Sequence, residues 1–88
     1  MAAAPTRIRC SGVNYRQGFI EVTAFIHNNK INFETWQVDP SAQIDGVDWV
    51  DDESLSDSDI TANCEIELSI EDARNLANSL LNMIGERP

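Results

Sequence analysis

The chain holds few of the side chains that carry out chemistry in enzymes or that bind metals. It contains a single histidine, His27, and two cysteines whose spacing does not match that of zinc ligands. A lone imidazole with no nucleophile at a readable spacing is typical of a surface or structural residue. The glycine-rich phosphate loop, the G-x-S-x-G elbow and the H-E-x-x-H pair are missing from the sequence. The sequence therefore predicts no catalytic residue, no cofactor and a protein that is not an enzyme.

Basic residues are also scarce. Six Lys and Arg stand against 15 Asp and Glu, which gives a formal net charge of −9. A protein with this balance repels phosphate groups, so direct binding to nucleic acid or to an anionic membrane is not expected.

Long apolar runs are missing as well. No run approaches the roughly 20 residues that a membrane-spanning helix needs, and the first residues lack the hydrophobic stretch of a signal peptide.

Cys10 and Cys64 lie on segments in which polar and apolar residues alternate, and there they are consistent with small buried side chains. A disulfide between them is the alternative, and it requires an oxidising compartment. We therefore expect a soluble, cytoplasmic protein.

The residues that are present suffice for one small domain. The chain has 88 residues, of which 42% are apolar, and this is enough to fold. Residues 1–6 are small and neutral and predict a flexible leader, followed by a single domain over residues 7–88. Alternating or β-branched runs predict four strands, over residues 7–10, 19–27, 30–38 and 62–68. The second and third strands are expected to form a hairpin with Asn28-Asn29 as its two-residue turn.

The end of the sequence predicts a helix. Ser69 and Asp72 have the spacing of a capping box, and Gly85 is placed to stop the helix. Between them, an apolar stripe recurs at helical spacing and is wide enough to cover a sheet. The expected fold class is α+β: an antiparallel sheet of about four strands with one C-terminal helix packed on one face. A long acidic loop, or a minor hairpin turned by Asp45-Gly46, is expected between the third and the last strand.

The predicted sheet has two apolar faces, and one helix covers only one of them. The face with Ile20, Val22 and Ala24 is assigned to the helix. The other face must be covered by the segment 39–61, by a second subunit or by a binding partner. The residues of this candidate dimer face are Phe19, Phe25, Trp36 and Val38.

Charge is distributed very unevenly along the chain. Residues 31–73 contain thirteen acids and no Lys or Arg, whereas residues 1–30 contain four bases and one acid. Such asymmetry steers a basic partner toward the acidic part, although a solvated loop that only maintains solubility has the same composition. The acids do not match the spacing of an EF-hand calcium loop, so no metal site is expected.

These features favour a protein-binding inhibitor that acts without catalysis. Its carboxylates would occupy phosphate positions in a basic cleft of a nucleic-acid-binding protein, with one tryptophan as a stacking residue or wedge. The predicted partner-binding residues are Asp45, Asp48, Trp49, Asp51, Asp52, Glu53, Asp57 and Asp59.

In size, charge and lack of catalytic motifs the chain resembles small phage-encoded inhibitors such as anti-CRISPR and anti-restriction proteins. That resemblance is one of class and transfers no site residue. The alternatives are a homodimeric structural domain and an immunity protein that neutralises a nuclease toxin.

Overall fold

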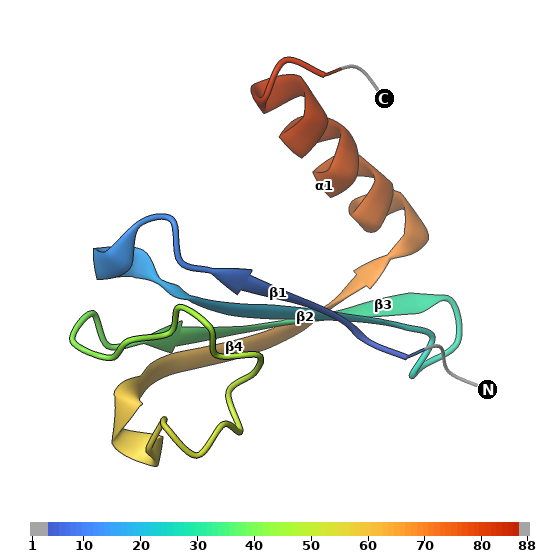
Figure 1. Ribbon diagram of the computed structural model, residues 1–88. Helices are drawn as coiled ribbons and strands as arrows, with labels where there is room; N and C mark the ends of the chain where they lie inside the picture. The colour runs from blue at the N-terminus through green and yellow to red at the C-terminus, as the bar shows by residue number, and fades with distance from the viewer. Residues whose placement is uncertain (1–3, 87–88) are drawn as a thin grey trace.

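A four-stranded antiparallel sheet followed by one helix makes up the computed structural model, which describes residues 4–86 (Figure 1). Each strand pairs with the strand before it, so the order across the sheet is β1-β2-β3-β4. The strands are β1 (Thr6–Cys10), β2 (Gly18–Ala24), β3 (Lys30–Val38) and β4 (Ile60–Ser69), and the helix is α1 (Ile70–Met83). This architecture confirms the predicted α+β fold. Residues 1–3 of the predicted leader lie outside the described residues, and Thr6 already pairs with Val22 in the sheet.

The predicted hairpin of β2 and β3 is present, but its turn is longer than expected. Strand β2 ends at Ala24, because Phe25 adopts the left-handed conformation with φ 61°. A turn follows in which the Lys30 amide donates to the His27 carbonyl at 3.1 Å, and Asn29 has φ 58°. Asparagine tolerates positive φ better than other non-glycine residues, but of the Asn28-Asn29 pair only Asn29 adopts it, whereas a two-residue hairpin turn needs it at both positions. Residues 25–27, predicted as strand, belong to the connection.

Both ends of α1 are those predicted from the sequence. The Ser69 hydroxyl accepts from the Asp72 amide at 3.0 Å, and the Asp72 carboxylate accepts from the Ser69 amide at 3.3 Å. At the other end Gly85 has φ 86°, its amide donates to Asn82, and the amide of Glu86 donates to Leu81. This pair of bonds is a Schellman motif, which favours glycine because of its positive φ. Among the described residues, no helix is long and apolar enough to cross a bilayer.

The segment between β3 and β4 contains no minor hairpin. The expected turn at Asp45-Gly46 forms, with the Val47 amide donating to the Ile44 carbonyl at 2.9 Å and Gly46 at φ 84°. The residues on either side of this turn do not pair as strands. Instead, Ile44 and Val47 are both buried in a core beneath the segment, which runs across one face of the sheet (Figure 1).

The two cysteines lie at opposite edges of the sheet. Cys10 is in β1 and Cys64 is in β4, with β2 and β3 between them, and both are free thiols. The disulfide alternative is therefore wrong. Cys64 is also exposed, because the helix does not extend over its end of β4, and this corrects the expectation of a buried side chain.

Gly18 is required by the close approach of β2 and β3. A Cβ atom at this position would collide with the backbone carbonyl of Trp36, which cannot move without breaking the ladder. We predict that Gly18→Ala lowers the free energy of unfolding by about 3 kcal/mol or more, as overpacking against backbone does. Urea denaturation measures this loss. Gly12→Ala is the control, since its Cβ meets no atom within 4 Å; a loss of similar size in both variants would contradict the argument.

Candidate functional site

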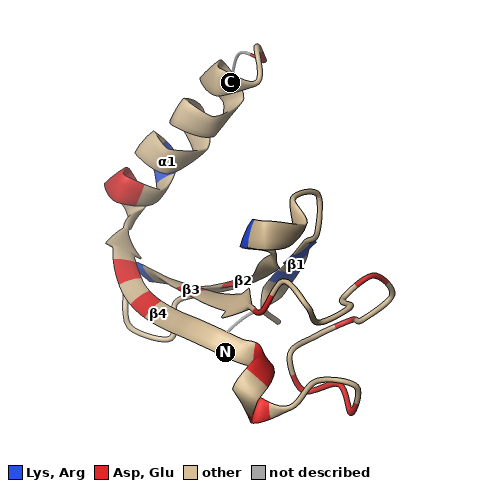
Figure 2. Cartoon of the chain, turned by 90° about the vertical axis from the view of Figure 1, so that its left-hand side faces the viewer, with Lys and Arg blue, Asp and Glu red and all other residues tan. Residues whose placement is uncertain are grey.

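The acidic loop, residues 39–59, carries the predicted carboxylates across the face of the sheet opposite α1. Figure 2 shows acidic positions along this loop, including the short 3-10 turn η2 (Asp57–Asp59), and on strand β4. Its carboxylates can bind a partner in a defined arrangement only if the loop has a fixed conformation. The contacts that fix this conformation come from apolar residues, from two arginines and from a buried glutamine.

The apolar residues of the acidic loop form the core of the protein. Ile44, Val47 and Trp49 pack against Phe19 and Val38, and all five side chains are buried. The ring of Trp49 meets Phe19 edge-on with centroids 5.5 Å apart, and it meets Trp36 in the same way at 4.9 Å. Edge-to-face pairs of this kind add to the stability gained from burial alone.

Two arginines of β1 hold the acidic loop from the side. The guanidinium carbon of Arg7 lies 4.5 Å from the centre of the Trp49 ring, and Arg7 Nε also donates to Glu21 at 2.8 Å. Arg9 donates to the carbonyl of Val47 at 2.9 Å. Part of the basic N-terminal region therefore binds the chain's own acidic loop. Sequence reasoning missed this role, although the alternation of Arg7 and Arg9 placed both on one face of the strand.

A buried glutamine closes the base of the acidic loop. The side chain of Gln17 donates to the carbonyls of Asp39 and Ala42, at 2.8 and 2.7 Å. The amide of Asp39 donates to the carbonyl of Asp59 at 2.7 Å, which joins the two ends of the loop. No feature of the sequence singles out Gln17 for this role, because its partners are carbonyl groups distant in the chain.

Three aspartates shape the acidic loop locally. The Asp39 carboxylate accepts bonds from the hydroxyl and amide of Ser41, and these lower the pKa of Asp39. The amide and hydroxyl of Ser54 lower the pKa of Asp52 in the same way. Asp59 accepts a bond from the Ser56 amide at 2.8 Å, so Asp52 and Asp59 have structural roles. The remaining predicted carboxylates are exposed, and within the described residues no side-chain hydrogen bond or ion pair engages them: Asp45, Asp48, Asp51, Glu53 and Asp57.

The structure corrects two predictions about aromatic residues. Trp49 is 8% exposed, so it cannot act as a stacking residue or wedge against a partner. The candidate dimer face is also wrong: Phe19 and Val38 are 1% exposed beneath the acidic loop, and Trp36 packs against Trp49. Phe25 lies in the hairpin connection and is 54% exposed. Of the three coverings considered, the loop itself covers this face, because its own apolar residues supply the contacts.

A row of glutamates extends the acidic surface from the loop onto the sheet. Glu21 pairs with Glu34 across β2 and β3, and Glu34 pairs with Glu65 across β3 and β4. Glu34 lies two residues before Trp36, so the row is on the same face as the acidic loop. Like charges directly opposite each other are destabilising in a sheet. Arg7 neutralises Glu21, whereas within residues 4–86 Glu34 and Glu65 receive only amide donors, from Asn63 and Asn32. This row was missed because it depends on strand register.

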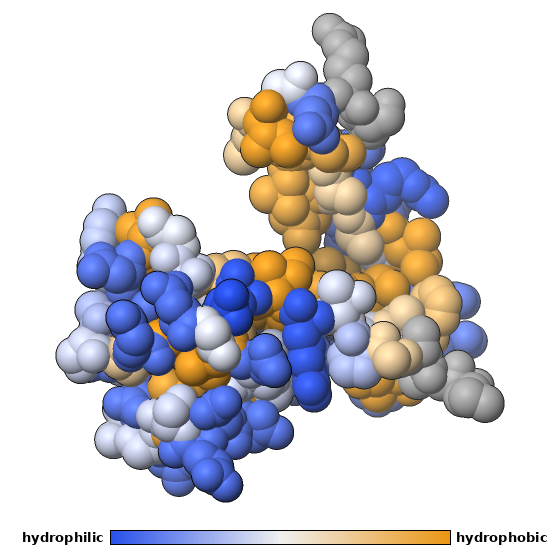
Figure 3. All heavy atoms as spheres, viewed as in Figure 1, coloured by the Kyte–Doolittle hydropathy of each residue, from blue (hydrophilic) through white to orange (hydrophobic). Residues whose placement is uncertain are grey.

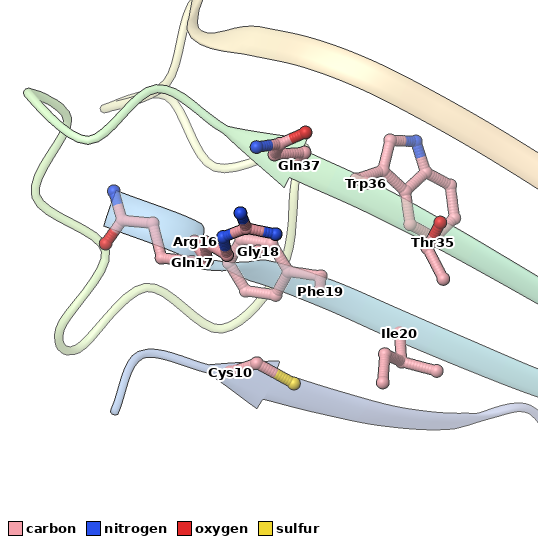
Figure 4. A pocket seen from close by; sticks show the side chains of 9 residues that line it. All are labelled: Cys10, Arg16, Gln17, Gly18, Phe19, Ile20, Thr35, Trp36 and Gln37. Carbon is pink, nitrogen blue, oxygen red and sulfur yellow. The ribbon is translucent and has the colours of Figure 1, made fainter. Parts of the chain in front are cut away.

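No constellation typical of catalysis or metal binding accompanies these carboxylates in residues 4–86. A hollow of about 310 Å³ lies at the ends of β1, β2 and β3. Among the side chains that line it are the thiol of Cys10 and the guanidinium of Arg16 (Figure 4). His27 is exposed, and its Nδ1 forms a hydrogen bond with the carboxylate of Glu67 in β4. Groups of three or more His, Cys, Asp or Glu side chains that could hold a metal ion do not occur in the described part of the chain.

Comparison of the chain with protein families, with curated proteins and with solved structures finds no match.

We predict that Trp49→Ala lowers the free energy of unfolding by about 3–5 kcal/mol, because it removes the largest side chain of the loop's core. Amide hydrogen exchange should show lost protection at Val47, whose amide bonds to Ile44 within the acidic loop. Tyr15→Ala is the control, since Tyr15 is exposed and its loss should change stability by less than about 0.5 kcal/mol. Unchanged protection at Val47 in the Trp49 variant would show that the loop does not depend on this residue.

The Asp–Ser turns predict a pH dependence of the acidic loop. Their hydrogen bonds favour the ionised carboxylates and lower the pKa values of Asp39 and Asp52 in the folded state. The stabilisation is therefore complete above the unfolded aspartate pKa of about 3.9, and it is lost as the pH falls through the lower folded values. Ser41→Ala should raise the pKa of Asp39 and leave that of Asp52 unchanged, as measured by NMR titration of the side-chain carboxyl carbons. Equal pKa values of Asp39 in the parent and the variant would refute this cause.

Proposed function

We propose that this protein is a non-catalytic inhibitor that binds a basic, nucleic-acid-binding surface of another protein. Its binding site is the acidic surface, defined as the exposed carboxylates of the acidic loop together with Glu34 and Glu65 of the sheet. The partner is recognised by its basic side chains. Lys and Arg residues that are arranged to bind phosphates also bind carboxylates, through the same charge-assisted hydrogen bonds. Proteins of host defence systems that act on DNA or RNA are the partners to test first.

The observation that carries this proposal is the unneutralised pair Glu34 and Glu65. The two residues face each other directly across β3 and β4, and among the residues that the structure describes only the amide groups of Asn63 and Asn32 donate to them. Isosteric glutamines would avoid the repulsion at no cost in packing. A local arrangement that reduces stability is characteristic of functional sites, where the lost stability is compensated when the partner binds. A loop that served solubility alone would not require repelling carboxylates in the sheet beside it.

The fixed conformation of the acidic loop supports the same proposal. A flexible acidic segment loses conformational entropy when it binds, which weakens the complex. Here Trp49, Arg9 and Gln17 already hold the loop against the sheet. The carboxylates are therefore positioned before the partner arrives, and long-range attraction between opposite charges accelerates association.

We predict that affinity capture from a bacterial lysate retains a nucleic-acid-binding protein or complex, which is released by salt and by added double-stranded DNA. Mass spectrometry identifies the retained protein. A loop variant, Asp51→Asn/Glu53→Gln, and a sheet variant, Glu34→Gln/Glu65→Gln, should each weaken its binding about tenfold or more. The sheet variant should also be more stable by about 0.5 kcal/mol, because it removes a like-charge pair.

The matched control is Glu71→Gln/Glu86→Gln, which removes the same charge from positions outside the acidic surface: Glu71 lies in the first turn of α1, and Glu86 follows Gly85 beyond its C-terminal end. It should bind like the parent protein. Equal weakening in all three variants would mean that only net charge matters. Retention that survives both acidic-surface variants, or that DNA does not compete for, would refute the proposal.

A further inference from the structure

An apolar groove of about 380 Å³ lies between α1 and the face of the sheet opposite the acidic loop. Its lining includes Ile20, Val22 and Phe33 from the sheet and Leu76 and Leu80 from the helix, and no charged side chain. Figure 3 shows apolar residues on the side of α1 that faces the sheet and on the sheet below it. The apolar surface continues to the end of the helix, where Leu80 is 55% exposed and Met83 is 81% exposed.

The junction of β4 and α1 keeps this groove open. Ser69 is both the last residue of β4, paired with Lys30, and the N-cap of α1. No loop residue separates the strand from the helix, whereas connections that bring a helix back onto its sheet are usually two to six residues long. The helix therefore rises away from the sheet, and none of its residues is buried (Figure 1). Closing it would break either the Ser69–Lys30 pair or the capping box.

The chain alone is too open for its mass. Its accessible surface is 6399 Å², whereas a folded monomer of 9.8 kDa is expected to expose about 5,200 Å². Its radius of gyration is 14.4 Å, against about 12 Å for a compact domain of this length. The excess of about 1,200 Å² exceeds the roughly 800 Å² that each partner buries in a standard interface. The excess is therefore large enough to supply one such interface through the groove.

The helix itself requires a partner surface. An isolated helix of 14 residues is marginal in water, and helices in proteins are stabilised mainly by packing of the apolar face. This face is partly exposed at Leu76, at 38%, and mostly exposed at the end of the helix, at Leu80, Met83 and the C-cap residue Ile84. The core under the acidic loop lies on the other side of the sheet and does not stabilise the helix.

We propose that a second copy of this chain occupies the groove and forms a two-fold symmetric dimer. A two-fold interface needs a self-complementary surface, and the groove meets this condition: it contains a hollow and, beside it, the projecting apolar end of α1. The end of each helix enters the groove of the other copy. The acidic loops remain on the outer faces, so their carboxylates are kept away from the interface. A basic or nucleic-acid partner does not fit an uncharged groove.

Sedimentation velocity of the full chain over a wide range of concentration tests the dimer. The parent protein should sediment as a dimer, and added salt should preserve or strengthen it by screening the repulsion between the chains. Leu80→Glu and Met83→Glu should each weaken the dimer about tenfold or more, because they place a charge in the apolar interface. Met83 is so exposed in the single chain that its substitution does not disturb the fold.

Asn75→Glu is the control, since it adds the same charge on the opposite side of α1. Fluorescence of Trp36 and Trp49, which lie in the core on the other face, reports whether each variant remains folded. A parent protein that is monomeric at every concentration overturns the proposal, as does a dimer that both apolar-face variants leave unchanged. Because this assay contains no other protein, its result is independent of the proposed binding to a basic partner, which salt weakens.

Discussion

The packing of Trp49 against the sheet is the contact on which the rest of the structure depends. Its ring touches Phe19, Trp36 and the guanidinium of Arg7, and thereby joins the acidic loop to β1, β2 and β3. Without this contact, mutual repulsion of the carboxylates and chain entropy would both favour a detached loop. Burial of one large aromatic side chain stabilises a structure by on the order of 3 kcal/mol, which is enough to offset exposed carboxylates repelling each other through water.

Local signals in the sequence predicted the elements, because the groups that decide them are neighbours in the chain. The capping box of Ser69 and Asp72 and the positive φ of Gly85 set the two ends of α1 within a few residues. Strand β3 was likewise predicted with its observed bounds, Lys30–Val38. The hairpin turn was not, because a left-handed Phe25 has no signature in residue type. Its conformation follows from how β2 and β3 align.

The candidate site was predicted in its charge but not in its construction. Exposed carboxylates could be read from composition, whereas the bonds from Gln17 to Asp39 and Ala42 join residues more than twenty positions apart. The assignment of Trp49 to a partner failed for a related reason. Apolar residues interleaved with acids can face solvent, a partner or the protein's own core, and only the position of the sheet decides among these. The sequence also predicted that the helix would cover its face, but the direct junction at Ser69 leaves that face open.

The two faces of the sheet are suited to different partners, and this separation has a physical reason. Carboxylates buried in an apolar interface would lose their hydration without compensation, and apolar side chains beside the acidic loop would add nothing to the recognition of Lys and Arg. Under the two proposals, the dimer carries one acidic surface on each outer face. A partner with two basic sites at a matching separation would then be bound through both, and the second contact would form at a high effective concentration. Salt acts on the two interfaces in opposite directions, so a complex that first gains and then loses affinity as salt rises would be the signature of this arrangement.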